Sequence, residues 1–291
     1  MAIYNLGSIN ADFFYRVPHL PAAGETLAAT SVLRGLGGKG TNMSVAAARA
    51  AARTIHIGAV GEDGKWAVER LLEYGVDTRH IATLPETPTG HAIINVDDAG
   101  ENAIVLLPGA NHVISEAAIG SALSEASPGD TLLIQNETNN QAYAAEMAKQ
   151  LDLFTACAAA PFEAEAMQAV LPYTDILFLN AVEAAQFEQA TGQAPPDLPV
   201  SQVIVTKGSQ GCSLYDNGSG EIRHFPALPV TPVDTTGAGD TFTGYVLAAL
   251  DRGMPMPQAI ALATRASALM VTRHGTADVI PDLKEVQDAS F

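Results

Sequence analysis

From about residue 113 onward, the chain alternates regularly between helix-like segments and short β-rich runs. The expected strands in this part are Thr131–Gln135, Leu153–Ala158, Asp175–Leu179, Gln202–Thr206 and 221–225. Runs such as Ile176-Leu177-Phe178 place apolar side chains at consecutive positions, which is typical of strands buried on both faces. Buried strands separated by helices assemble into a parallel sheet with helices packed against it. The sequence therefore predicts an α/β fold with a mostly parallel central sheet.

The first part of the chain departs from this alternation. Strands are expected at residues 2–7 and 54–60, and residues 90–96 and 102–107 predict a β-hairpin. Residues 13–34 are interrupted by proline and glycine and indicate short β excursions. We expect the hairpin and these excursions to form a small separate sheet that covers the site as a lid and excludes water.

Composition narrows the class of protein. The 291 residues are 47% hydrophobic and 16% charged, which suits one large domain with a substantial core. The net charge of −17 and the lack of any Lys/Arg cluster argue against a nucleic-acid partner. Cys157 and Cys212 are too few for a disulfide framework or a thiolate metal site. Without a signal peptide or a run of about 20 apolar residues, a cytoplasmic protein with no membrane partner is expected.

A turn of small residues places Gly237, Ala238 and Gly239 where a helix is expected to begin. Backbone amides at a helix N-terminus are unpaired and lie at the positive end of the helix dipole, so the turn predicts an anion site. Asp240 follows directly. An anion site beside a carboxylate suits phosphoryl transfer to a hydroxyl, which needs donors for the phosphoryl charge and an acceptor for the proton. A glycine-rich turn with a capping Asp is the structural alternative.

Two helices are expected after this turn. The first extends to about Leu250, and the second from about Pro257 to Thr272, with Gly275 as its C′ glycine.

A second glycine-rich stretch, residues 35–42, leads into an Ala-rich helix expected from about Met43 to Arg53. Glycines let a ligand approach the backbone, and Lys39 and Asn42 supply donors for hydroxyls or a phosphate. We interpret this stretch as part of a polyol or phosphate-ester pocket.

The same glycines allow another interpretation. Gly35, Gly37 and Gly40 match the G-x-G-x-x-G spacing of dinucleotide sites, with Glu62 and Asp63 at roughly the right distance. A nucleotide-dependent dehydrogenase therefore remains an alternative, although the segment before the glycines is a poor buried strand.

Polar residues follow the ends of several expected strands. They are Asn10 and Asp12, Asn136 and Glu137, Asn180 and Glu183, and Thr206-Lys207-Gly208. Ligands of open α/β sheets bind beyond the carboxyl ends of the strands, so this edge is the expected site. Asn10 and Asp12 also suit an Asx turn, and Asn180 and Glu183, three residues apart, also suit a helix-capping pair.

Taken in order, these motifs resemble those of the ribokinase-like (PfkB) family of carbohydrate kinases over essentially the full length. The matching segments are Gly7–Asp12, Gly37–Asn42, Gly61, Gly75–Asp77, Pro108–Asn111, Asn180–Glu183, Thr206–Gly211 and Asp234–Asp240. The resemblance implies a three-layer αβα sandwich, residues 1–291, with a β-sheet lid formed by roughly 11–34 and 88–108. It further implies ATP- and Mg²⁺-dependent phosphorylation of a sugar primary hydroxyl and favours D-ribose as acceptor. A small sheet with one apolar face would be marginal alone, so we also expect a homodimer formed through the lid.

The resemblance also assigns roles. Asp240 would be the general base, and the amides of Gly237, Ala238 and Gly239 the anion hole. The sugar-binding set would be Asn10, Asp12, Gly38, Lys39, Gly40, Asn42 and Glu137. The nucleotide-binding set would be Asn180, Thr206, Lys207, Gly208, Ser209, Gly211, Gly239 and Thr264. Glu183 would act on Mg²⁺ indirectly, and a loop for K⁺ would comprise Asp234, Thr236, Met270, Arg273 and Gly275.

Some residues depart from the family pattern. The bulky Tyr245 stands where a small residue is usual, Thr264 and Arg265 stand where an Asn and a small residue often flank adenine, and Val279 replaces a Ser near the K⁺ loop. The adenine pocket and the K⁺ requirement are therefore open.

The acceptor is also open. A nucleoside, a fructose phosphate or a keto-deoxy sugar acid is an alternative to ribose, as is an inactive sugar or nucleotide sensor with this fold. The lid contains few cations to hold a sugar phosphate, with Arg16 and Arg34 the main candidates.

Overall fold

The computed structural model describes residues 1–291, and its centre is a nine-stranded sheet ordered β13-β12-β11-β10-β9-β8-β1-β4-β5. The strands are β1 (Ala2–Leu6), β4 (Arg53–Gly61), β5 (Asp77–Leu84), β8 (Thr131–Gln135), β9 (Phe154–Ala158), β10 (Ile176–Asn180), β11 (Gln202–Thr206), β12 (Cys212–Asp216) and β13 (Glu221–Phe225). Strands β11 to β5 are parallel, and only β12 and β13 pair antiparallel, at one edge. The mostly parallel sheet is confirmed.

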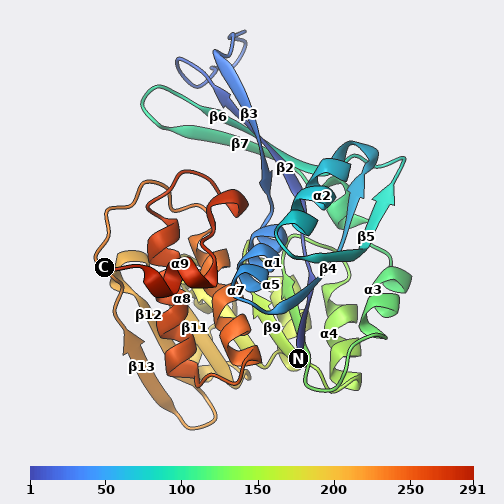
Figure 1. The fold of residues 1–291 in the computed structure, drawn as a ribbon, viewed down its shortest axis with the longest axis vertical. Coiled ribbons are helices and arrows are strands. Elements are labelled where there is room, and N and C mark those ends of the chain that lie inside the picture. The colour runs from blue at the N-terminus through green and yellow to red at the C-terminus, as the bar shows by residue number, and fades with distance from the viewer.

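Helices cover both faces of the sheet (Figure 1). On one face lie α1 (Lys39–Arg49), α2 (Lys65–Glu73), α7 (Ala238–Asp251), α8 (Met256–Met270) and α9 (Leu283–Asp288), and on the other α3 (Glu116–Leu123), α4 (Gln141–Gln150), α5 (Ala164–Val170) and α6 (Ala181–Thr191). Successive strand residues feed opposite cores, because side chains alternate across a strand. Leu133 belongs to the core under α1 and α7, whereas its neighbours Leu132 and Ile134 belong to the core under α3 and α4. These layers make the expected αβα sandwich.

A separate four-stranded sheet, ordered β3-β2-β6-β7, projects from the body beyond the carboxyl ends of the central strands (Figure 1). Its strands are β2 (Asn10–Arg16), β3 (Ser31–Gly37), β6 (Gly90–Val96) and β7 (Asn102–Leu107). The predicted hairpin is β6–β7, and the predicted β excursions are β2 and β3. Apolar side chains remain exposed on this sheet, among them Leu33 at 68% and Val105 at 69%.

Two strands of the central sheet were not expected. Strand β5 is rich in polar residues and lies half-buried at the sheet edge, so its sequence lacks the apolar run of a buried strand. Strand β12 (CSLYD) is short and mixed in character, and it turns back antiparallel directly after Gly211.

The predicted bounds of two helices were wrong. Helix α1 begins at Lys39 rather than Met43 and ends at Arg49 rather than Arg53, because Gly38, with φ of 97°, starts the helix earlier. Helix α8 ends at Met270 rather than Thr272, with Val271 as its C-cap. Gly275 lies beyond the cap and is not its C′ glycine.

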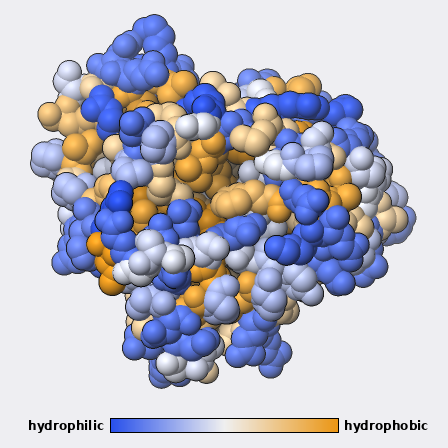
Figure 2. Space-filling view, turned by 90° about the horizontal axis from the view of Figure 1, so that it is seen from below, coloured by the Kyte–Doolittle hydropathy of each residue, from blue (hydrophilic) through white to orange (hydrophobic).

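The surface is mixed in character. Seen from below, hydrophilic residues occupy much of the periphery, and apolar residues lie among them nearer the centre (Figure 2). No helix has both the length and the apolar character needed to cross a bilayer.

Candidate active site

Helix α7 begins at a turn of small residues with unpaired backbone amides. Gly237 is its N-cap with φ of 78°, a left-handed conformation that glycine adopts without a Cβ penalty. The amide of Ala238 donates to the Thr235 carbonyl at 3.2 Å, whereas the amides of Gly237, Gly239 and Asp240 donate to no group of the protein. The helix dipole adds positive potential at the same point. The turn therefore offers the amides of Gly237, Gly239 and Asp240 as free donors for an anion, whereas the Ala238 amide is already hydrogen-bonded.

Asp240 lies in the first turn of α7 and is 7% exposed. Its Oδ2 accepts a hydrogen bond of 2.8 Å from Asn42 Nδ2, in the first turn of α1. Burial raises the pKa of the Asp240 carboxyl, while the nearby Lys39 ammonium and the Asn42 bond favour its charged form. Asp240 is in turn the main cause of the raised pKa of Lys39. A carboxylate held in this way is suited to accept a proton.

Close packing of α1 on α7 brings Asn42 and Asp240 together. A Cβ on Gly244 would lie 2.6 Å from the Cβ of Ala46 and 2.7 Å from the carbonyl oxygen of Met43, so only glycine permits this helix crossing. Tyr245, the next residue, is fully buried, and its hydroxyl donates to the Pro281 carbonyl at 2.7 Å. This bulky ring is therefore a packing element between α7 and the segment before α9.

Glu137 joins the end of β8 to the start of α1. Its Oε2 accepts from Ser8 Oγ at 2.5 Å and from the Lys39 backbone amide at 3.0 Å. Ser8 Oγ also accepts from the Gly40 amide at 3.1 Å. These bonds fix the position of Glu137 beside Lys39. Ser8 was missed by sequence reasoning, since a serine after a strand carries no specific signal.

Asn10 and Asp12 extend the site onto β2. Asn10 Oδ1 accepts from Asn111 Nδ2 at 2.8 Å, and Asn111 Oδ1 accepts from the Ile9 amide at 2.9 Å. Asp12 lies over Gly37, where a Cβ would come within 1.9 Å of its Oδ2. Burial, followed by the nearby Glu137, raises the pKa of Asp12 to about 6. Asn111 therefore orients Asn10. In the sequence, Asn111 stood out only as part of the Pro108–Asn111 segment that resembles the family.

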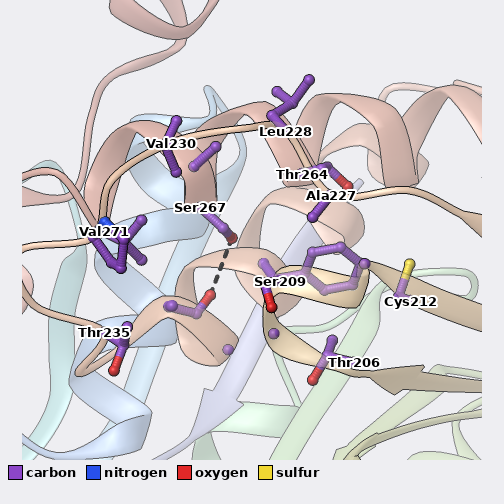
Figure 3. A pocket seen from close by; sticks show the side chains of 17 residues that line it. Thr206, Ser209, Cys212, Ala227, Leu228, Val230, Thr235, Thr264, Ser267 and Val271 are labelled. Carbon is purple, nitrogen blue, oxygen red and sulfur yellow. Dashed lines mark hydrogen bonds between the residues drawn. The ribbon is translucent and has the colours of Figure 1, made fainter. Parts of the chain in front are cut away.

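Two adjoining cavities border the N-terminus of α7. The first, of about 330 Å³, is lined by residues from the β11–β12 turn, the segment after β13, α7 and α8 (Figure 3). The second, of about 260 Å³, contains Lys39 and Asp240. Both are bordered by Thr206, Thr235 and Gly239. A ligand that spans both cavities therefore passes the free amides of α7.

Most of the expected nucleotide residues line these cavities. Thr206, Gly208, Ser209, Gly211, Gly239 and Thr264 line the first, and Asn180 and Glu183 line the second. Lys207 lines neither, because its Nζ donates to Ser213 Oγ at 2.7 Å. Its ammonium therefore lies away from both cavities.

Asn180 and Glu183 form a capping box at the start of α6. Asn180 Oδ1 accepts from the Glu183 amide, and Glu183 Oε2 accepts from the Asn180 amide, both at 2.8 Å. The capping alternative is therefore correct, while both residues still border the second cavity.

The expected cation loop brings Asp234 close to Gly275. Asp234 Oδ1 accepts from the Thr236 amide at 2.9 Å, and Oδ2 accepts from the Gly275 amide at 3.3 Å. The Met270 carbonyl accepts from the Arg273 amide at 3.0 Å. Carboxylate, hydroxyl and carbonyl oxygens suit a hard cation, so the donor types fit K⁺, although the carboxylate oxygens of Asp234 and the Met270 carbonyl already accept hydrogen bonds. No group of three or more His, Cys, Asp or Glu residues is placed to hold a metal ion.

The dehydrogenase alternative does not fit the fold. Gly35 and Gly37 belong to β3, where they pair with Asp12 and Asn10 of the small sheet. They are not in a strand-to-helix turn of the parallel sheet, which is where a dinucleotide fingerprint holds its pyrophosphate.

Comparison with known proteins identifies the family. The profile described as "pfkB family carbohydrate kinase" matches residues 3–283. The ribokinase of Haemophilus influenzae is 34% identical over 294 residues, covering 96% of this chain and 95% of the relative. The ribokinase of Bacillus subtilis is 33% identical, covering 97% of each. The chain belongs to the pfkB family of carbohydrate kinases.

Solved structures agree with this placement. A ribokinase from Thermotoga maritima superimposes with a TM-score of 0.88 at 30% identity, covering 99% of this chain and 98% of that one. Arabidopsis thaliana ribokinase complexed with ribose and ATP gives a TM-score of 0.86 at 28% identity, covering all of both chains. The pfkB kinase fold thus extends over the whole chain, small sheet included.

Among the departures from the pfkB pattern, Arg265 does not line the nucleotide cavity. Its guanidinium donates to the carbonyls of Val286 and Ala289 at 3.1 and 2.7 Å. It therefore anchors the C-terminal segment. Thr264, the other departure on α8, does line the cavity.

Proposed function

We propose that this kinase transfers the γ-phosphoryl group of ATP to the primary hydroxyl of D-ribose, giving ribose 5-phosphate and ADP. The observation that carries the proposal is the buried Asp240 carboxylate, paired with Asn42 and Lys39, beside unpaired amides at the start of α7. The relatives named ribokinase, and the neighbour complexed with ribose and ATP, support ribose as the acceptor.

In the proposed reaction, Asp240 removes the proton from the sugar hydroxyl as its oxygen attacks the γ-phosphorus. The bond from that phosphorus to the β–γ bridging oxygen breaks, and ADP leaves with the electron pair. The amides of Gly237, Gly239 and Asp240 stabilise the charge on the transferred group. Lys39 adds a positive charge at the same place and favours the ionised form of the Asp240 carboxyl, whose pKa burial raises. The Ala238 amide, bonded to Thr235, contributes less than its neighbours.

The sugar is proposed to bind between β2 and the start of α1. Asn10, Asp12 and Glu137 would accept from its hydroxyls, and Lys39 and Asn42 would donate, with Gly38 and Gly40 allowing close approach. Arg34, one of two candidate cations for a sugar phosphate, instead lies over the Trp66 ring at 4.2 Å. That engagement favours an unphosphorylated acceptor.

The nucleotide is proposed to occupy both cavities, with its base in the first and its γ-phosphate at the start of α7. Mg²⁺, when bound with the phosphates, neutralises part of their charge. Glu183, which lines the second cavity and whose Oε1 is free of the capping box, would act on it through water. Asp234, Thr236 and the carbonyls of Met270, Arg273 and Gly275 would hold K⁺, which would stiffen the anion-binding turn.

The small sheet is proposed to be a lid and a dimer interface in the cytoplasmic enzyme. Its strands β3 and β7 expose Val32, Leu33, Ile104, Val105 and Leu106 at 51–69%. These side chains alternate between the two faces of the sheet, and apolar groups exposed in this way are stabilised by covering them with a second copy. Light scattering at micromolar concentration is expected to give a dimer, and Val105→Lys a monomer. A monomeric wild-type protein would contradict the dimer.

An acceptor screen tests the proposed function. Release of ADP is measured with pentoses, hexoses, sugar phosphates, keto-deoxy sugar acids and nucleosides, and the product is identified by ³¹P NMR. D-Ribose is expected to give the highest kcat/KM. A higher value for a nucleoside or fructose 6-phosphate would contradict ribose, and no turnover with any acceptor would contradict a kinase.

A further inference from the structure

The end of the first cavity that lies away from Asp240 has apolar walls. The residues shared with the second cavity, Thr206, Thr235 and Gly239, mark the phosphate end. Ala227, Leu228 and Thr264 gather at the other end, with Val230 and Val271 along one side (Figure 3). No Asn, Gln, His, Lys or Arg lines this cavity. The base end therefore lacks any side chain that carries both a hydrogen-bond donor and an acceptor in a fixed plane.

The hydroxyl protons nearest the base end are already used. Thr264 Oγ1 donates to the Ile260 carbonyl at 2.8 Å, so the side chain has no proton to offer a base. Ser267 Oγ donates to the Ala238 carbonyl at 3.0 Å (Figure 3). The Cys212 thiol, whose pKa burial raises to about 11, is only a weak donor. Ser209 is the remaining hydroxyl, and it lies exposed on the 3-10 turn after β11.

We propose that this cavity holds a purine by apolar contact and shape, and that the kinase uses GTP and ITP as well as ATP. The inference rests on the proposed function. Adenine offers an acceptor at N1 and a donor at N6, whereas guanine and hypoxanthine reverse this pattern. A site built to hydrogen-bond one pattern rejects the other by ~10⁴-fold or more, whereas apolar pockets discriminate by only ~10–200-fold. A pyrimidine covers less of the apolar wall and is used less well.

The experiment measures kcat/KM for MgATP, MgITP, MgGTP and MgCTP at saturating D-ribose, following formation of sugar phosphate. The three purine nucleotides are expected to agree within about tenfold, with CTP lowest. A GTP value below about one thousandth of the ATP value would lie beyond the discrimination of an apolar pocket and would overturn the inference. Absence of sugar phosphate with every nucleotide would instead contradict the proposed function, so the two failures are distinguishable.

Variants at Thr264, on α8, test which residue reads the base. Thr264→Val removes a hydroxyl that has no free proton, and the ATP-to-GTP ratio is expected to stay within about threefold of wild type. Thr272→Val is the control, because the hydroxyl of Thr272, just beyond the end of α8, also donates to a backbone carbonyl, that of Leu269 at 2.7 Å, but lies outside the cavity. Thr264→Asn places a free amide on the wall and is expected to shift the ratio about tenfold or more. The inference would be overturned if the ATP-to-GTP ratio fell in Thr264→Val, or if it stayed unchanged in Thr264→Asn.

Ser209→Ala tests the one exposed hydroxyl. The ATP-to-GTP ratio is expected to be unchanged. A selective loss of ATP use in this variant would mean that Ser209 reads the base and would overturn the inference.

Discussion

Asn42 and Asp240 are 198 positions apart in the chain, yet the amide of one donates to the carboxylate of the other at 2.8 Å. Each residue lies in the first turn of its helix, and Gly244 lets the two helices approach closely enough for the bond to form. The bond links the glycine-rich stretch proposed to bind sugar to the turn proposed to bind phosphate. It also favours the ionised form of a carboxylate whose pKa burial raises.

Removing this donor is expected to move the pH profile. In Asn42→Ala the pKa of Asp240 rises, so the acidic limb of kcat shifts to higher pH by about one unit, the equivalent of one such bond. Lys39→Met is expected to shift the limb further in the same direction, because Lys39 is the larger cause favouring the charged form. Profiles of kcat from pH 5 to 9 at saturating ribose check both. If the acidic limb does not move in either variant, Asp240 is not the group whose ionisation sets it.

Asp12 is expected to make ribose binding depend on pH. Burial and the nearby Glu137 raise its pKa to about 6, so it is protonated below that pH and loses an acceptor for the sugar. The KM for ribose is expected to rise about tenfold as the pH falls from 8 to 5, as the charged fraction falls. Asp12→Asn should show a high KM with no such dependence. A wild-type KM that is flat over this range would contradict the role of the carboxylate.

A buried histidine is expected to make stability depend on pH. His56 Nε2 donates to the Gly7 carbonyl at 3.0 Å, which leaves Nδ1 to accept from Ser44 Oγ at 2.8 Å. Ser44 Oγ in turn accepts from Asn5 Nδ2 at 2.8 Å. This chain of bonds requires the neutral ring, and burial lowers the pKa of His56 to about 4.

Because the unfolded histidine has a pKa of about 6.5, the unfolded state binds the extra proton first, and stability falls as the pH drops below 6.5. Between pH 7 and 5 the wild type is expected to lose about 2 kcal/mol more free energy of unfolding than His56→Gln. Urea unfolding of both proteins at the two pH values measures the difference. If both proteins lose the same free energy of unfolding, His56 is not the source of the pH dependence.

A single alanine offers a gain in stability. Ala51 follows α1 with φ of 67°, a left-handed conformation that costs any residue with a Cβ. Ala51→Gly is expected to raise the free energy of unfolding by about 1 kcal/mol. The control is Ala50→Gly, because Ala50 has φ of −81° and a buried methyl, and that change should lower stability by about 1 kcal/mol. Similar losses in both variants would contradict strain at Ala51.

The sequence was most informative where local chemistry determines the structure. Apolar runs predicted β8, β10 and β11, and the small-residue turn predicted the start of α7. Strand β5 was missed because an edge strand that is half polar carries no buried-strand pattern. Elements of that kind are defined by their neighbours rather than by their own residues.

In the candidate site, too, the sequence predicted individual residues but not the contacts between distant segments. Asp240 and Asn42 could be selected from their motifs, but the bond between them depends on a helix crossing that no local pattern encodes. Ser8 and Asn111 hold Glu137 and Asn10 in place through contacts about 100 or more residues apart in the chain. Tyr245 stood out in sequence as a bulky residue near the site, and only packing explains it.

Substitution of the proposed general base is the most direct measurement. Asp240→Asn keeps the size of the side chain but cannot take the hydroxyl proton, so turnover of ATP and D-ribose should fall by ~10²–10⁴-fold or more. ATP affinity, measured by calorimetry on the same variant, should change by less than about threefold, since the nucleotide cavity is lined mainly by other residues. A large loss of turnover with intact ATP binding is the predicted result. Near-normal turnover in Asp240→Asn would contradict proton removal by Asp240.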